Sequence, residues 1–201
     1  MPTILLVRHG ETHWNRVKRV QGHTDSLTPL TLRGVEQARA YGARIRRLIG
    51  DEPGWRVMSS PLARCVQTTA ILCEAAGLDF ERVTFDDRLK EVATGSFSGR
   101  LKSVLEARFP ALMAGRGREV WYLRCPGGED WDALAARLGD WLADLAAGDK
   151  VIAVSHGAAG KVVRALYGGL SPEAALAGDS PQDAFYRLRG GHIERIAAIP
   201  D

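Results

Sequence analysis

Short apolar runs alternate with longer stretches of helical periodicity along this chain of 201 residues. The clearest runs are residues 4–7 and 151–154, and further short strands are expected at 56–58 and 83–85. Apolar runs of this length, without polar alternation, are typical of parallel strands that are buried on both faces. The pattern therefore predicts a parallel sheet with helices between consecutive strands.

Helical spacing of apolar residues fills most of the intervening chain. Thr31 is expected to cap a helix whose apolar face covers residues 35–49. Ser60 and Pro61 are expected to be the N-cap and first residue of a second helix, which ends at Gly77. Further helical patterns cover residues 101–109, 131–145 and 157–167.

The C-terminal pattern is different. Two expected strands, residues 185–188 and 193–199, flank Gly190 and Gly191, and this glycine pair is typical of a tight hairpin turn. We therefore predict a single domain over residues 1–201 with a three-layer α/β/α fold. Its central sheet is mostly parallel, with helices on both faces and an antiparallel C-terminal hairpin.

Two segments lack strong periodicity. Residues 8–29 are expected to form a polar loop, and residues 111–128 are irregular and rich in glycine. Together with the preceding helical pattern, the second segment predicts an inserted cover over residues 100–130.

Composition narrows the class of protein. The hydrophobic fraction is 45%, the charged fraction 25% and the formal net charge +3, with the basic residues interspersed. These values predict a globular protein with no nucleic-acid partner and no membrane association. The three cysteines are odd in number and lie in no C-x-x-C pair, which indicates thiols in a reducing compartment. With no leader pattern at the N-terminus, we expect a cytoplasmic monomer or homodimer.

A repeated phrase carries the first chemical signal. Arg8-His9-Gly10 follows the first apolar run, and Ser155-His156-Gly157 follows the run at 151–154. Ligands of open α/β sheets bind at the carboxyl ends of the strands, so both imidazoles are expected in one crevice. Each glycine is expected to let the backbone turn sharply and approach a ligand.

Basic residues near this edge suggest an anionic ligand. Arg8 ends a buried strand and needs an anion, which Glu11 or a bound phosphate would supply. Arg64 lies in the first turn of a helix, where a bound anion would offset the unfavourable dipole. Lys161 and Arg164 are interpreted as solvated or peripheral. Glu91 is a carboxylate at the same edge, or else a surface partner of Lys90 or Arg88.

Taken together and in order, these blocks resemble the signature of the histidine phosphatase superfamily, also called phosphoglycerate mutase-like proteins. The residues that carry the resemblance are Arg8-His9-Gly10-Glu11-Thr12, Trp14-Asn15, Gln21-Gly22, Asp25, Leu30-Thr31, Gly34, Gln37-Ala38, Ser59-Ser60-Pro61-Leu62-Ala63-Arg64, Gln67-Thr68, Leu89-Lys90-Glu91, Gly95, Gly99 and Ser155-His156-Gly157.

The resemblance implies catalysis through a phosphohistidine on a small phosphorylated substrate. His9 would be the nucleophile, and Glu91 would protonate the leaving alkoxide and then activate water. Other positions would bind the substrate: Arg8, Arg64 and His156 would hold the phosphoryl oxygens, Asn15 would donate a further hydrogen bond, and Gln21, Gly22 and Gly157 would line the pocket. His13, His23 and His192 match no catalytic position.

No metal site or cofactor is expected, because the sequence has no H-E-x-x-H motif and no Cys/His cluster. Mutases of the family carry an Arg directly after the acid block and paired arginines in the cover. Here Val92 follows Glu91, and Gly117 separates Arg116 from Arg118. A phosphatase is therefore favoured, with a phosphoglycerate mutase and a non-enzymatic phosphate sensor as alternatives.

The residues of the cover suggest how a substrate would be recognised. A second anionic group is expected to meet cover arginines, and Trp121 and Tyr122 could pack a sugar or ring. The arginines in or near the cover are Arg108, Arg116, Arg118 and Arg124.

Overall fold

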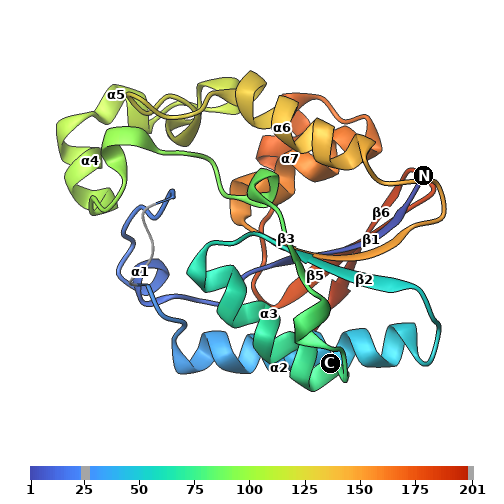
Figure 1. The fold of residues 1–201 in the computed structure, drawn as a ribbon. Helices are drawn as coiled ribbons and strands as arrows, with labels where there is room; N and C mark the ends of the chain where they lie inside the picture. Colours follow the sequence, from blue (N-terminus) through green and yellow to red (C-terminus); the bar gives the residue numbers. More distant parts are fainter. Residues whose placement is uncertain (24–27, 199–201) are drawn as a thin grey trace.

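Six strands form one sheet, in the order β3-β2-β4-β1-β5-β6, in the computed structural model, which describes residues 1–23 and 28–198 (Figure 1). Strands β1 to β4 run parallel, and β5 and β6 are antiparallel, which confirms the predicted sheet. Ile199, the predicted end of the hairpin, lies outside the described residues. The strands are β1 (Thr3–Arg8), β2 (Trp55–Ser59), β3 (Thr84–Phe85), β4 (Lys150–Ser155), β5 (Ala184–Arg189) and β6 (His192–Ala197).

Helices cover both faces of the sheet, as predicted (Figure 1). On one face, α2 (Leu32–Ile49) and α3 (Ala63–Ala76) bury their apolar stripes against alternate residues of the central strands. On the other face, α6 (Trp131–Ala143) and α7 (Gly157–Gly168) pack against the intervening residues. The strands are apolar throughout because both faces are buried.

The helix ends follow the sequence signals except at Ser60. The Thr31 side chain accepts from the Gly34 amide, and Gly77 ends α3 with a left-handed φ of 69°. The expectation that Ser60 caps α3 is wrong, because the N-cap is Leu62 and no side chain caps the helix. Ser60 is buried and its hydroxyl has another partner, described below.

The predicted polar loop contains a short helix, α1 (His13–Arg16). A capping box forms it: the Thr12 hydroxyl accepts from the Asn15 amide, and the Asn15 side chain accepts from the Thr12 amide. Asp25, which belongs to the family resemblance, lies outside the described residues.

The segment over residues 100–130 lies near the carboxyl ends of the strands and contributes to a small, separate apolar cluster. Val20, Phe97, Leu105 and Cys125 form that cluster, which joins the segment to the loop after β1. The remaining short helices are α4 (Lys102–Arg108), α5 (Pro110–Met113), α8 (Pro172–Ala177) and the 3₁₀ turns Phe80–Arg82, Asp87–Leu89, Gly95–Phe97, Gly117–Glu119 and Trp121–Leu123.

Candidate active site

The register of β1 against β4 brings the two His-Gly phrases together. Arg8 pairs with Ser155, so His9 and His156 leave the sheet side by side, with ring centroids 5.2 Å apart. The two histidines are 2% and 1% exposed. The two imidazoles are therefore adjacent at the carboxyl edge, as expected, but of the two only His9 lines the cavity there.

His9 has one free basic ring nitrogen. Its Nδ1 lies 2.8 Å from the Gly10 carbonyl oxygen, which can only accept, so Nδ1 carries the proton and Nε2 the lone pair. Burial, followed by the charges of Arg64 and Arg8, lowers the pKa of His9 well below its usual value. The imidazole is therefore neutral at pH 7, the form that acts as a nucleophile.

His156 has the opposite tautomer. The Arg64 Nε donates to its Nδ1 at 3.1 Å, so Nε2 carries the proton and donates to the Ser60 hydroxyl at 2.8 Å. Burial and the charge of Arg64 lower the pKa of His156 well below its usual value. In this arrangement the ring orients Arg64, and its contact with a phosphoryl oxygen stays a prediction.

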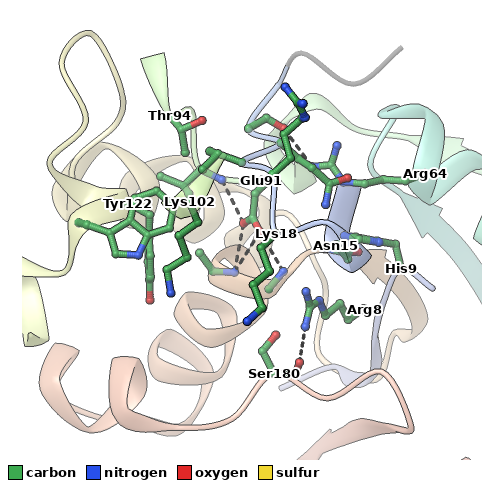
Figure 2. A pocket seen from close by; sticks show the side chains of 18 of the residues that line it. Arg8, His9, Asn15, Lys18, Arg64, Glu91, Thr94, Lys102, Tyr122 and Ser180 are labelled. Atoms are coloured by element: carbon green, nitrogen blue, oxygen red, sulfur yellow. Dashed lines mark hydrogen bonds between the residues drawn. The ribbon is translucent and has the colours of Figure 1, made fainter. Parts of the chain in front are cut away.

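Arg64 and Arg8 are both held beside His9 (Figure 2). Arg64 is 1% exposed and donates from Nη2 to the Gly22 carbonyl oxygen at 3.0 Å. Arg8 donates to the Ser180 carbonyl oxygen, whereas Glu11 accepts from Thr31 at 2.7 Å. Glu11 is thus no partner for Arg8, and both guanidinium groups border the cavity.

Asn15 owes its orientation to the capping box. Its Oδ1 accepts from the Thr12 amide at 3.0 Å and from the Thr12 hydroxyl at 3.1 Å. Because Oδ1 is engaged, the Nδ2 end of the amide is the end that can donate to an anion. Gln21 lines the same cavity, and its Oε1 lies 3.0 Å from the Thr12 hydroxyl, whose single proton it shares with Asn15 Oδ1.

Glu91 is bound by the N-terminus of α7 and not by Lys90 or Arg88 (Figure 2). Its carboxylate accepts from the amides of Gly157, Ala158 and Ala159 at 3.0–3.2 Å and from that of Val92 at 3.1 Å. A carboxylate at a helix N-terminus is also favoured by the macrodipole. Lys90 and Arg88 pair with other carboxylates instead.

Of the two glycines that follow the histidines, Gly157 lines the cavity, as expected, and Gly10 does not. Neither Gly10 nor Gly157 has a positive φ. A Cβ on Gly10 would lie 2.4 Å from the Gly34 carbonyl oxygen, so this glycine permits contact with α2. Gly22 does need to be glycine, since its φ is 53° and a Cβ would lie 2.3 Å from Thr94 Oγ1.

Arg137 is a site residue that the sequence reasoning missed. It donates to the carbonyl oxygens of Arg88, Lys90 and Glu91 at 2.6–2.9 Å and pairs with Glu129 at 2.6 Å. It thereby fixes the turn that presents the Glu91 side chain. The available signal was a cation inside the apolar stripe of the helix at 131–145.

Arg164 is buried and not solvated, but it does not line the cavity, so it is peripheral to the site as expected. It is 8% exposed, donates to the Asp179 carbonyl oxygen and stacks on the Tyr186 ring at 3.9 Å. Lys161, the other expected solvated cation, is half-buried and lines the cavity.

The cavity in front of His9 has a volume of about 670 Å³. The segment over residues 100–130 contributes Lys102, Trp121 and Tyr122 to its wall, among others. Burial and the charge of Glu91 raise the pKa of Tyr122 to about 12, so its hydroxyl stays neutral. None of the four cover arginines lines the cavity among the described residues; Arg118 and Arg124, for example, pair with Asp132 and Glu119.

The described residues contain no group of three or more His, Cys, Asp or Glu side chains placed to hold a metal ion. Within the same residues, no helix is long and apolar enough to cross a membrane. None of Cys65, Cys73 and Cys125 is in a disulfide.

Comparison with known proteins decides the family. The family model described as "Histidine phosphatase superfamily (branch 1)" matches residues 4–192. This chain belongs to that superfamily. A relative from Salmonella paratyphi C, named "Probable phosphoglycerate mutase GpmB", is 36% identical over 162 residues, which are 79% of this chain and 71% of that protein.

Solved structures share the whole fold of this chain. A mycobacterial glucosyl-3-phosphoglycerate phosphatase is 25% identical with a TM-score of 0.77, and the match covers 100% of this chain and 99% of that one. An alpha-ribazole phosphatase from Shigella flexneri has a TM-score of 0.77 at 23% identity, covering 98% and 96% of the two chains. Relatives of this chain thus include proteins named as phosphatases and as a mutase.

Proposed function

We propose that this protein is a metal-independent phosphomonoesterase that hydrolyses a small phosphorylated metabolite through a phosphohistidine. The observation that carries the proposal is the state of His9: a neutral imidazole, with Nδ1 held by Gly10, in a cavity bordered by Arg8, Arg64 and Glu91. A phosphatase among the solved relatives, at 25% identity, supports the reaction type.

In the proposed reaction, His9 Nε2 attacks phosphorus and forms the N–P bond as the P–O bond to the leaving group breaks. Glu91, protonated at this point, gives its proton to the leaving alkoxide. Arg8, Arg64 and the Asn15 amide stabilise the charge on the phosphoryl oxygens. Water then attacks phosphorus, Glu91 takes its proton, and the N–P bond breaks to release phosphate and neutral His9.

Trapping the intermediate tests this proposal. Brief incubation with ³²P-labelled substrate, followed by a quench, should leave an acid-labile, base-stable label on the peptide that contains His9. Activity on p-nitrophenyl phosphate should survive excess chelator and be inhibited by vanadate. A label on the His156 peptide would mean that His156, and not His9, is the nucleophile. A requirement for a metal ion would exclude the mechanism.

Phosphoglycerate mutase activity is the second candidate, because the relative named as a mutase is 36% identical. The cover arginines are outside the cavity wall and Val92 follows Glu91, so we expect water to be the acceptor. Incubation with 3-phosphoglycerate and catalytic 2,3-bisphosphoglycerate should yield little 2-phosphoglycerate. Isomerisation faster than phosphate release on every ester tested would establish the mutase instead.

A further inference from the structure

The cavity has more positive charge than one phosphoryl group needs. Arg8 and Arg64 border His9, and Arg19 is engaged elsewhere, donating to the Gly99 carbonyl oxygen and stacking on Trp14 at 5.4 Å. Three lysines remain in the wall: Lys18, Lys102 and Lys161. The two carboxylates of the described wall are Glu91, which α7 binds, and Glu106.

Lys18 and Lys102 are held next to each other by main-chain hydrogen bonds. The Lys102 amide donates to the Lys18 carbonyl oxygen at 2.9 Å, and an antiparallel bridge joins the adjoining Arg19 and Leu101. Both lysine side chains extend into the cavity (Figure 2). Two segments far apart in sequence thus deliver a pair of ammonium groups to one wall.

Lys18 also has an unusual backbone. Its φ of 53° is the one positive value at a non-glycine residue in the described part of the chain. Strained backbone of this kind persists where the surroundings enforce it, often at ligand clamps. No ion pair or hydrogen bond engages the Lys18 side chain among the described residues. The strained residue thus presents an uncompensated charge to the cavity.

The other two lysines have only weak or neutral partners. Lys102 lies 3.6 Å from Glu106, and both side chains are about half exposed, so this pair is easily exchanged for a ligand. Lys161 donates one N–H to the Leu176 carbonyl oxygen at 3.0 Å, and the two other N–H groups of its ammonium can donate to a ligand. Burial, followed by the charges of Arg164 and Arg8, lowers the pKa of Lys161, so an added anion would favour its charged form.

We propose that Lys18 and Lys102, with Lys161 from α7, form a second anion subsite, so that the substrate is a phosphate monoester carrying another anionic group. This inference rests on the proposed phosphatase function, since His9 would take the first phosphoryl group. A carboxylate and a second phosphate share the chemistry that the lysines recognise. The cover arginines, which we expected in this role, lie outside the cavity wall.

Matched substrates test the subsite. 3-Phosphoglycerate and glycerol 3-phosphate differ by a carboxylate in place of a hydroxymethyl group, and propane-1,3-diol bisphosphate and 3-hydroxypropyl phosphate differ by a phosphate. We expect kcat/KM to be at least about tenfold higher for the anionic member of one pair. The pair with the larger ratio identifies the second group.

Lys18→Gln combined with Lys102→Gln should reduce that ratio by about 10- to 100-fold. Lys18→Arg should retain it, and Arg16→Gln, two residues before Lys18 at the end of α1 but outside the cavity wall, serves as the matched control. A ratio near one in the wild type, or a ratio that the double variant leaves unchanged, would overturn the subsite while leaving the phosphatase function standing.

Binding calorimetry separates the two proposals. Tighter binding of the anionic member by wild type, lost in the double variant, would support the subsite even if no phosphate were released from any ester. Equal binding of both members would refute it.

Discussion

Replacing Glu91 with Gln separates the chemical role of this residue from its structural one. A general acid matters most where the leaving group needs a proton, which an alkoxide does and a nitrophenolate does not. We therefore expect Glu91→Gln to lower kcat/KM by about 10²–10⁴-fold for glycerol 3-phosphate. The loss for p-nitrophenyl phosphate should be much smaller.

The structure adds a second effect of the same substitution. Glu91 Oε2 accepts from the amides of Gly157 and Ala158, and Oε1 accepts from three amides. A glutamine would turn an NH₂ group toward N–H donors on one side. Leaving a fully buried donor without a partner costs about 1–3 kcal/mol, which is an upper bound for the partly buried Glu91 position. At about 2–4 °C per kcal/mol for a chain of this size, the Tm should fall by several degrees.

The comparison of two leaving groups removes this structural effect. Both substrates meet the same folded enzyme, so any loss that comes from a displaced α7 divides out of the ratio of their kcat/KM values. Measuring kcat/KM also excludes slow dephosphorylation, since it reports steps through the first irreversible one. The assay should be run well below the Tm of the variant.

Equal losses on both substrates would mean that Glu91 only holds the N-terminus of α7. No loss on either would place the acid elsewhere. Glu11 is the carboxylate of the first motif, but it accepts from Thr31 and does not line the cavity, so it is no substitute for Glu91. Glu106 does line the cavity, so Glu106→Gln is the matched control. For this variant, the ratio of kcat/KM on glycerol 3-phosphate to kcat/KM on p-nitrophenyl phosphate should equal that of the wild type.

Two further predictions concern the paired histidines. Because burial holds the pKa values of His9 and His156 below that of an unfolded His, the unfolded chain binds more protons in acid. The stabilisation should be complete above about pH 7.5 and be lost as the pH falls through about 6.5, by up to about 1.4 kcal/mol per imidazole at pH 5.5. Thermal melts from pH 7.5 to 5 check this, and a Tm loss equally large in a variant lacking both rings would refute it. Ser60→Ala removes the acceptor of His156 Nε2, so we expect Arg64 to lose its alignment and kcat/KM for p-nitrophenyl phosphate to fall about tenfold. Unchanged kcat/KM and unchanged inhibition by vanadate would show that the ring needs no such support.

The strands and the two histidines were predictable because local patterns specify them. Continuous apolar runs require burial on both faces, and that requirement fixes a parallel sheet with helices on each side. The residues that follow parallel strands then lie at the same edge of the sheet, because the carboxyl ends of all these strands meet there. His9 and His156 lie together for this reason, and the register of β1 on β4 makes the two phrases equivalent.

The supporting contacts were not predictable in the same way. Ser60 has the local signature of an N-cap, yet its hydroxyl binds His156, which is distant in sequence. Arg137 belongs to an amphipathic helix, and only the packing of that helix reveals three carbonyl oxygens within its reach. The Lys18–Lys102 pair likewise depends on how the cover meets the loop after β1. These contacts join residues that are distant in sequence, so they depend on tertiary structure and cannot be predicted from a local sequence pattern.

The two His-Gly phrases show how that tertiary structure assigns different work to equal residues. Both rings are buried and neutral, but a carbonyl oxygen faces Nδ1 of His9, whereas a guanidinium N–H faces Nδ1 of His156. An acceptor at Nδ1 leaves a lone pair on Nε2, and a donor at Nδ1 places the proton there instead. Only His9 therefore has the unprotonated Nε2 that can attack phosphorus. His156, whose Nε2–H donates to Ser60, is suited to orient Arg64, the arginine that we propose binds the phosphoryl group.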